Sequence, residues 1–428
     1  MAIERNKRPA ISKITDLDII KPERILLDNG IPVSVIRMGD TAVNRLDLIF
    51  EGGRCDEKKP MVSDLVAALV REGAGNRIAA EIAECLDYYG SWMGCEASSH
   101  NVTMSIYSLN KYFGDVIPVF ADIAVAPLFP EKEIENMKNV AVTRLKDNCR
   151  KVAYLASSEF QKQYYGETHN LGKRPDEAAI RGVSRDDLVA FHKEKMHPAN
   201  ANIVISGMID DRVLDSVNRT IGQIPAMSLP SRSASDKPAK EFCPAEVLVE
   251  KKDAVQSCVK IGIPAVLRTH PDYIPLRILV TAFGGYFGSR LMQNIREEKG
   301  YTYGISAMLI GMRDNSCITV SSQCATAYTE KVIEEIRNEM DKLRAEPIGA
   351  EELERVKSYM RGDLAKTTDT PFSLSDYYCA AITNSIPDDY FHNQSAAVDS
   401  ITPEMLQKMA AKYLDSGRML TVVAGSLK

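Results

Sequence analysis

"VSRDDLVAFHKEKMHPANANIVISG" at residues 183–207 has a counterpart 218 residues later, "ITPEMLQKMAAKYLDSGRMLTVVAG" at residues 401–425. Each stretch opens with a residue suited to cap a helix, Ser184 in the first and Thr402 in the second. Each then continues as an amphipathic helix and ends in a β-branched strand that closes on glycine. The match runs without a gap, which predicts that the chain contains one structural unit twice.

A second pair of similar segments lies upstream. "FPEKEIENMKNVAV" at residues 129–142 matches "IGAEELERVKSYMR" at residues 348–361, at an offset of 219. Both segments are predicted helices entered after a turn that contains proline. Chance similarity between amphipathic helices is the alternative explanation. Two matches at nearly one offset favour an internal duplication.

The boundary between the two units is predicted from composition. "AMSLPSRSASDKPAK" at residues 226–240 is rich in Ser, Pro and charge and is typical of an exposed linker. It separates an N-terminal domain, residues 1–225, from a C-terminal domain, residues 241–428. Early in the first domain, "RILLDNGIPVSVIRM" predicts a hairpin that turns at Asn29 and Gly30. Hairpins beside long helices predict an α+β fold, in which two homologous domains each pack a mainly antiparallel sheet with helices.

The amino-acid composition limits which binding partners and which cellular compartment are expected for this chain. The 428 residues are 45% hydrophobic and 26% charged with a net charge of −5, which disfavours nucleic acid or an anionic membrane as partner. The N-terminal residues do not read as a signal peptide, and no apolar run is long enough to span a bilayer. The nine cysteines are scattered without a C-x-x-C pair, which predicts buried free thiols. A cytoplasmic location is therefore expected.

Several segments, taken in order, resemble one known family. In the first half they are "LDNGIPV", "FEGGRCDE" and "GAGNRIAAEIAECLDYYG", and in the second half "LVTAFGGYFGSRLMQNIREEKGYTYGIS". Over about residues 20–428 the chain resembles the insulinase-type (pitrilysin-like) zinc peptidases, in their two-domain bacterial and mitochondrial-processing form. The resemblance implies that each half is a sheet backed by helices and that two such units face each other across a chamber.

Active members of that family hold zinc through an H-x-x-E-H motif on the first long helix and a later glutamate. In this chain the resemblance places the motif's first His, its Glu and its second His at Asp64, Ala67 and Ala68, and the third ligand at Arg144. No histidine occurs before His100. We therefore predict that the chain binds no metal and needs no cofactor, with zinc present only in a partner subunit.

Asp64 and Arg144 carry opposite charges at two former ligand positions. One hypothesis is that they pair and fill the empty metal site. The alternative is that both are solvated surface residues. The rest of this helix, in "MVSDLVAALVREGAGNR" from residue 61 to 77, has an apolar face that predicts a packing role.

Other catalytic signals are missing from the sequence. The six histidines include no pair at i, i+4 spacing, and neither a G-x-S-x-G motif nor a P-loop occurs. Direct metallopeptidase activity by this chain alone is therefore the least favoured function.

The second half retains residues that the resemblance assigns to substrate binding. In "SRLMQNIREEKGYTYG", an Arg and a Tyr seven residues later match the family's pair at Arg296 and Tyr303. An arginine offers a fork of donors to a peptide carbonyl, and a tyrosine hydroxyl can stabilise a developing oxyanion. A surface Arg and a half-buried Tyr without function are the alternative. The glycines of "FGGYFG", residues 283–288, predict either close approach of backbone to a neighbour or a flexible helix entry.

These observations favour the non-metal, substrate-binding subunit of a heterodimeric zinc peptidase, which orients peptide for cleavage by a zinc-bearing homologous partner. Two alternatives remain. The chain is a non-catalytic structural or assembly subunit, or it is a homodimeric peptide-binding module. Peptide addition to a sheet edge is expected in this family. The corresponding segment of the first half, "GSWMGCEASSH" at residues 90–100, departs from the family pattern at Gly94.

Overall fold

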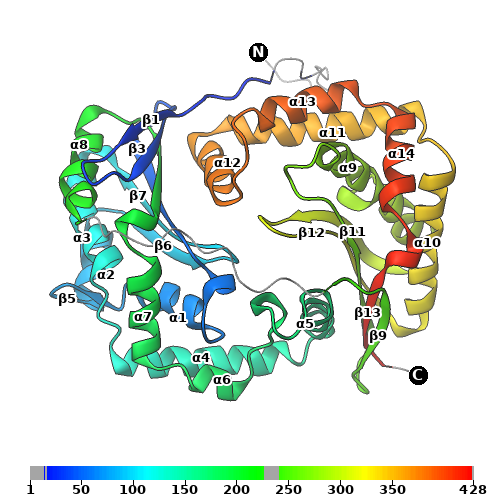
Figure 1. Ribbon diagram of the computed structural model, residues 1–428, viewed down its shortest axis with the longest axis horizontal. Helices are drawn as coiled ribbons and strands as arrows, with labels where there is room; N and C mark the ends of the chain where they lie inside the picture. The colour runs from blue at the N-terminus through cyan, green and yellow to red at the C-terminus, as the bar shows by residue number, and fades with distance from the viewer. Residues whose placement is uncertain (1–13, 15–16, 226–240, 427–428) are drawn as a thin grey trace, which may run out of the picture.

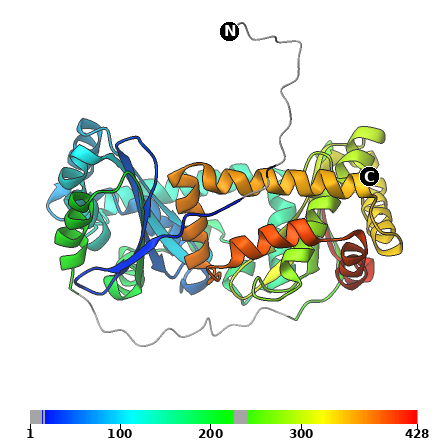
Figure 2. The ribbon, with the colours of Figure 1, turned by 90° about the horizontal axis from the view of Figure 1, so that it is seen from above.

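The computed structural model describes residue 14, residues 17–225 and residues 241–426, so the predicted linker lies outside the described residues. Two halves lie side by side along the longest axis of the molecule, each built on one sheet (Figures 1 and 2). The first sheet has six strands in the order β1-β2-β8-β3-β7-β6, and the second has five in the order β11-β12-β10-β13-β9. A small two-stranded sheet pairs β4 (Gly73–Ala74) with β5 (Arg77–Ile78).

The strands of the two large sheets are β1 (Glu23–Leu26), β2 (Pro32–Arg37), β3 (Val43–Glu51), β6 (Trp92–Ala97), β7 (Asn101–Leu109), β8 (Ala201–Gly207), β9 (Ala245–Glu250), β10 (Gln256–Pro264), β11 (Thr302–Gly311), β12 (Ser316–Ala325) and β13 (Leu420–Gly425). The α-helices of the first half are α1 (Val62–Leu69), α2 (Ala79–Tyr88), α3 (Phe113–Val125), α4 (Glu131–Asn148), α5 (Val152–Tyr165), α6 (Glu177–Arg181), α7 (Arg185–Lys195) and α8 (Asp211–Thr220). Those of the second half are α9 (Tyr273–Val280), α10 (Thr329–Ala345), α11 (Ala350–Asp369), α12 (Pro371–Thr383), α13 (Tyr390–Ser400) and α14 (Pro403–Tyr413).

The two sheets share one topology, which confirms the internal duplication. Read in the same direction, β2-β8-β3-β7-β6 corresponds to β9-β13-β10-β12-β11. In the first sheet β2 and β8 run parallel, in the second β9 and β13 do, and the other neighbours in both sheets are antiparallel. The mainly antiparallel α+β fold expected from the sequence is therefore confirmed.

The repeated segments take up the same structure in both halves. Ser184 caps α7 by accepting a hydrogen bond from the backbone N–H of Asp187 at 3.2 Å. Thr402 caps α14 in the same way, through the N–H of Met405 at 3.3 Å. Each of these helices is followed by the strand predicted after it, β8 or β13. The predicted hairpin also forms, between β1 and β2, and Gly30 adopts the left-handed φ of 84° that its loop requires.

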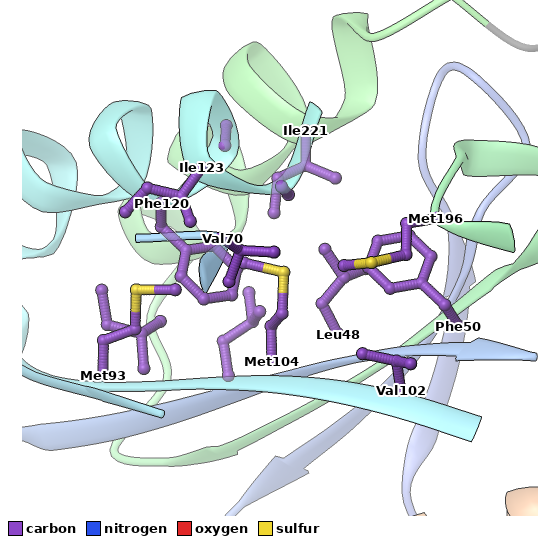
Figure 3. Close-up of a cluster of buried hydrophobic side chains, with 14 of the residues drawn as sticks. Leu48, Phe50, Val70, Met93, Val102, Met104, Phe120, Ile123, Met196 and Ile221 are labelled. Atoms are coloured by element: carbon purple, nitrogen blue, oxygen red, sulfur yellow. The ribbon is translucent and has the colours of Figure 1, made fainter. Parts of the chain in front are cut away.

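Each sheet carries a hydrophobic core on the face that its own helices cover. Figure 3 shows part of the first core, where Phe120 and Ile123 of α3 lie over Leu48 and Met104 of the sheet. Helix α1 joins this core through Leu65, Val66, Leu69 and the following Val70, which are all at most 2% exposed. The packing role predicted for this helix is therefore confirmed.

On their opposite faces the sheets are covered by helices from the other half. Helix α5 of the first half packs Phe160 and Tyr164 on the second sheet, against Cys258 and Val422 among others. A Cβ added to Gly262 of β10 would overlap the Phe160 ring, so glycine permits this close contact. The Tyr164 hydroxyl also donates a hydrogen bond to a carbonyl of the second sheet.

Helix α12 of the second half makes the reciprocal contact. Its Leu374 and Tyr378 pack against Ile36, Ile49 and Val204 of the first sheet. Ser375 donates to the buried carboxylate of Asp47 at 2.8 Å, and Asp376 pairs with Arg45 at 2.7 Å. Figure 1 shows both exchanged helices between the sheets, α12 along the upper side and α5 along the lower side. The halves are therefore joined by two symmetric packing contacts.

No helix in the described part of the chain is long and apolar enough to cross a membrane. All nine cysteines are free thiols; four of them are buried, and Cys243 is exposed.

Candidate functional site

Helix α1, on which the resemblance places the degenerate zinc motif, is held by an ion pair that the sequence did not reveal. Arg54, in the loop after β3, forms a two-pronged contact with Asp64 of α1, with N–O distances of 2.7 and 3.0 Å. The hydrogen bond to Asp64 is the largest effect raising the pKa of Arg54. The hypothesis that Asp64 pairs with Arg144 is wrong, since Asp64 pairs with Arg54. Arg144 lies exposed on α4, and no ion pair joins it to Asp64 in the described residues.

Asp64 pairs with Arg54 and not with Arg144 because the backbone near Arg54 is fixed close to α1. Backbone N–H groups of Arg54 and Cys55 donate to the carbonyls of Ser98 and Ser99, which fix this loop against the turn between β6 and β7. The guanidinium thus starts from a fixed position close to the first turn of α1, only ten residues before its partner. An arginine on the exposed face of α4 must instead lose side-chain entropy and hydration to reach the same carboxylate.

Glu57 is a second residue of this site that the sequence did not single out. Its carboxylate accepts hydrogen bonds from the N–H groups of Met61 and Ser63, at 3.1 and 3.0 Å, and from the Ser63 hydroxyl at 2.8 Å. Burial raises the pKa of Glu57, and these hydrogen bonds oppose that rise. Since Met61 at the helix N-cap makes no side-chain cap of its own, Glu57 takes over that task for α1.

These residues do not fit a zinc ion. Ala67 and Ala68 have no donor atom, Asp64 is engaged by Arg54, and Glu57 caps the helix. In the described part of the chain no three His, Cys, Asp or Glu side chains are grouped so that they could hold a metal. His192 and His197, the nearest pair in sequence, each bond a backbone carbonyl, and burial lowers the pKa of both.

We expect the purified chain to retain far less than one zinc per molecule after dialysis against metal-free buffer. Inductively coupled plasma mass spectrometry measures this content directly. The Cys243→Ser variant is the matched control, because an exposed thiol can bind zinc adventitiously. One tightly held zinc per chain in that variant would contradict the assignment.

Arg296 lies in an irregular helical segment whose other face is buried. This π-helical segment, η7 (Met292–Glu298), packs Ile295 into the second core. It ends near Gly300, which adopts a left-handed φ of 63°, as is common for the glycine that follows a helix. Such π-helical turns are rare and are frequent at functional sites.

Tyr303 follows at the start of β11, at an irregularity in the ladder. The pairing with β12 shifts between Thr302 and Gly304, so Tyr303 is the extra residue of a β-bulge. Its side chain is 91% exposed, the most exposed large hydrophobic residue of the described chain. Both predicted residues therefore lie at irregular backbone, one in the π-helical segment and one at the bulge.

Arg296 and Tyr303 meet in a cation–π cluster with a third residue, Phe287. The Arg296 Cζ lies 5.3 Å from the centre of the Tyr303 ring and 4.8 Å from that of Phe287. Phe287 is 61% exposed, and sequence reasoning missed it. The available signal was an aromatic residue inside the glycine-rich "FGGYFG". That segment does approach a neighbour closely, since a Cβ on Gly284 would lie 2.6 Å from the Cβ of Ala307 in β11.

The cluster leaves the arginine's donors available. In the described residues the Arg296 guanidinium donates no hydrogen bond, and its one ion pair joins its Nε to the carboxylate of the adjacent Glu297 at 3.4 Å. Stacking engages the faces of a guanidinium and leaves its N–H edges free. Arg296 can therefore bind a carbonyl or carboxylate, and the exposed Tyr303 hydroxyl can donate a further hydrogen bond.

The two halves differ at their equivalent edge strands, β6 and β11. On β6 the indole of Trp92 lies over Gly94, where a Cβ would come within 2.7 Å of it. Arg71 donates to the carbonyl of Met93 on the same strand at 3.2 Å. In the first half, side chains of the chain itself therefore occupy parts of this edge strand.

Comparison with known proteins shows that this chain is similar to M16 peptidases and to a non-peptidase homologue of them. Residues 182–360 match the family described as "Peptidase M16 inactive domain". The uncharacterised zinc protease YmxG of Bacillus subtilis is 25% identical over 346 residues, covering 80% of this chain and 81% of that protein. The non-peptidase homologue YmxG of Helicobacter pylori is 23% identical over 271 residues, covering 61% of this chain and 60% of that protein.

A solved structure agrees with these matches. The crystal structure of a peptidase M16 inactive domain from Pseudomonas fluorescens superposes with a TM-score of 0.85 at 21% identity, covering 96% of this chain and 99% of that one. The resemblance found in the sequence is thereby confirmed, and the relatives' names are consistent with an inactive M16-like protein.

Proposed function

We propose that this chain, which resembles the M16, insulinase-type peptidases and matches their inactive domain over residues 182–360, is the non-metal, substrate-binding subunit of a heterodimeric zinc peptidase. The observation that carries the proposal is the contact of the half-buried Arg296 guanidinium with the exposed Tyr303 ring, in a chain whose α1 has no metal donors free. Such a chain keeps groups that bind a peptide and has lost those that cleave it. The missing chemistry must then come from a partner.

In this proposal the substrate is a peptide, bound in extended form near the start of β11. The free N–H edge of Arg296 binds a backbone carbonyl and so fixes the register of the peptide. The Tyr303 hydroxyl donates to the oxygen on which negative charge develops when the scissile carbonyl is attacked. Zinc in the partner subunit supplies the activated water. This chain therefore binds and orients, and its partner cleaves.

The proposed partner is a homologous chain with an intact H-x-x-E-H motif. A second copy of this chain gives the homodimeric peptide-binding alternative, which cleaves nothing. The proposed compartment is the cytoplasm, on the basis of the nine free thiols. Neither nucleic acid nor a membrane is a proposed partner, given the net charge of −5.

Reconstitution tests the proposal. The chain is purified alone and mixed with a related chain encoded in the same genome that carries H-x-x-E-H. Complex formation is followed by analytical ultracentrifugation, and cleavage by a library of fluorogenic peptides with added zinc. We expect no cleavage by this chain, weak or no cleavage by the partner, and strong cleavage by the mixture.

Two outcomes would count against the proposal. Zinc-dependent cleavage by this chain alone would assign it an activity of its own. A stable complex whose activity does not depend on Arg296 or Tyr303 would make it a structural subunit. The second outcome is the main alternative, because exposed aromatic side chains can also serve a protein interface.

A further inference from the structure

We propose that Phe287 is a third residue of the peptide-binding site, a positioning residue that holds the Arg296 guanidinium in its binding orientation. This inference rests on the proposed function of Arg296 and adds a residue that the resemblance did not supply. Phe287 is the closer of the two rings to Arg296, at 4.8 Å against 5.3 Å for Tyr303.

The neighbours of Phe287 fix its backbone. Before it, the ring of Tyr286 stacks on Tyr359 of α11, with centres 4.9 Å apart and planes 27° from parallel. After it, Ser289 is 1% exposed, and its N–H donates to the carbonyl of Tyr286 at 3.1 Å. Both flanking contacts are buried or stacked, while the Phe287 ring itself stays 61% exposed. This backbone presents the exposed Phe287 ring to the Arg296 guanidinium.

Stacking solves a problem that an arginine in a binding site otherwise has. A free arginine side chain has four rotatable bonds and loses about 2 kcal/mol of rotamer entropy when it is ordered. With Phe287 and Tyr303 both within stacking distance of Arg296, that entropy is lost on folding rather than on peptide binding. The weakly hydrated guanidinium also suits the faces of aromatic rings. The N–H edges meanwhile remain open to the peptide.

The first test uses the chain alone and needs no partner. Phenylglyoxal modifies exposed arginines, and the rate at Arg296 is followed by peptide mass spectrometry. We expect Phe287→Ala to raise this rate severalfold, Phe287→Tyr to leave it unchanged, and Phe287→Leu to give an intermediate rate. Met308→Ala, which removes another exposed apolar side chain from β11, is the matched control and should have no effect. An unchanged rate in Phe287→Ala would overturn the inference.

The second test is a double-mutant cycle in the reconstituted complex. Phe287→Ala should lower kcat/KM about tenfold, mostly through KM, because it disorders a ground-state contact. Combined with Arg296→Ala, it should cost nothing more than Arg296→Ala alone, since Phe287 acts through Arg296. Phe287→Tyr should restore the wild-type value.

The outcomes separate this inference from the proposed function. If Arg296→Ala has no effect, the proposed function fails. If Arg296→Ala impairs cleavage while the effect of Phe287→Ala is absent or fully additive, only the role of Phe287 fails. A structural role for Phe287 would give additive losses and would not be rescued selectively by an aromatic ring.

Discussion

Replacing Arg296 with alanine and Tyr303 with phenylalanine together is expected to lower kcat/KM of the reconstituted peptidase by about 10³-fold or more. Loss of a hydrogen bond from a charged donor costs about 1.5–3 kcal/mol, which corresponds to roughly 10- to 10²-fold. Loss of one oxyanion donor costs about 10²–10³-fold in kcat. Because the two side chains stack on each other, the losses need not add.

The two single variants should each change a different kinetic constant. Arg296 binds the peptide before and during the reaction, so Arg296→Ala should raise KM strongly. Tyr303 acts on charge that appears only in the transition state, so Tyr303→Phe should lower kcat with KM nearly unchanged. Steady-state kinetics on one fluorogenic peptide measures both.

The controls are an exposed arginine and an exposed tyrosine far from the cluster. Arg144→Ala, on the outer face of α4, and Tyr88→Phe, at the end of α2, should leave both constants unchanged. The Tyr303→Phe variant should also fold as the wild type does, since Tyr303 is almost fully exposed. Wild-type kinetics in the double variant would remove both residues from the site.

Leu374→Asp is expected to destabilise the whole molecule by about 4 kcal/mol, because it places an unpaired charge among buried apolar side chains. Leu374 is fully buried where α12 of the second half meets Ile36, Ile49 and Val204 of the first sheet. Since that contact joins the halves, the loss should appear in both of them and not in α12 alone.

Urea unfolding followed by fluorescence and circular dichroism measures this effect. Trp92 is the only tryptophan, and its ring lies 5.5 Å from Tyr107, which in turn contacts Phe372 of α12. It therefore reports on the contact between the halves. Ala380→Asp, on the exposed side of the same helix, is the matched control and should change stability by less than about 0.5 kcal/mol. Equal stability of the two variants would show that the exchanged helix does not hold the halves together.

The sequence predicted the parts of the fold that depend on local patterns. The capped helices α7 and α14, the hairpin at Gly30 and the apolar face of α1 each follow from residues within one segment. The sequence could not predict that α5 covers the second sheet and α12 the first. An apolar helix face does not specify which of two similar sheets it covers.

For the candidate site, too, the sequence could not predict contacts that depend on how distant segments pack. Family resemblance placed Arg296 and Tyr303, and the structure brings them together. Phe287 and the Arg54–Asp64 pair escaped because their contacts depend on irregular backbone, namely a glycine-rich turn and a loop fixed by hydrogen bonds to another turn. Neither helical nor strand periodicity describes such segments.

The exchange of helices also sets an order of events during synthesis on the ribosome. The first sheet is complete once Gly207 has emerged, but its covering helix α12 begins only at Pro371. At about 5–20 residues per second, one face of that sheet stays open for on the order of ten seconds. Throughout that interval the aromatic face of α5 also lacks β13, a strand of its partner sheet that ends only at Gly425. The nascent chain therefore exposes two apolar surfaces at once, and its yield in the cell should depend on chaperones that shield them.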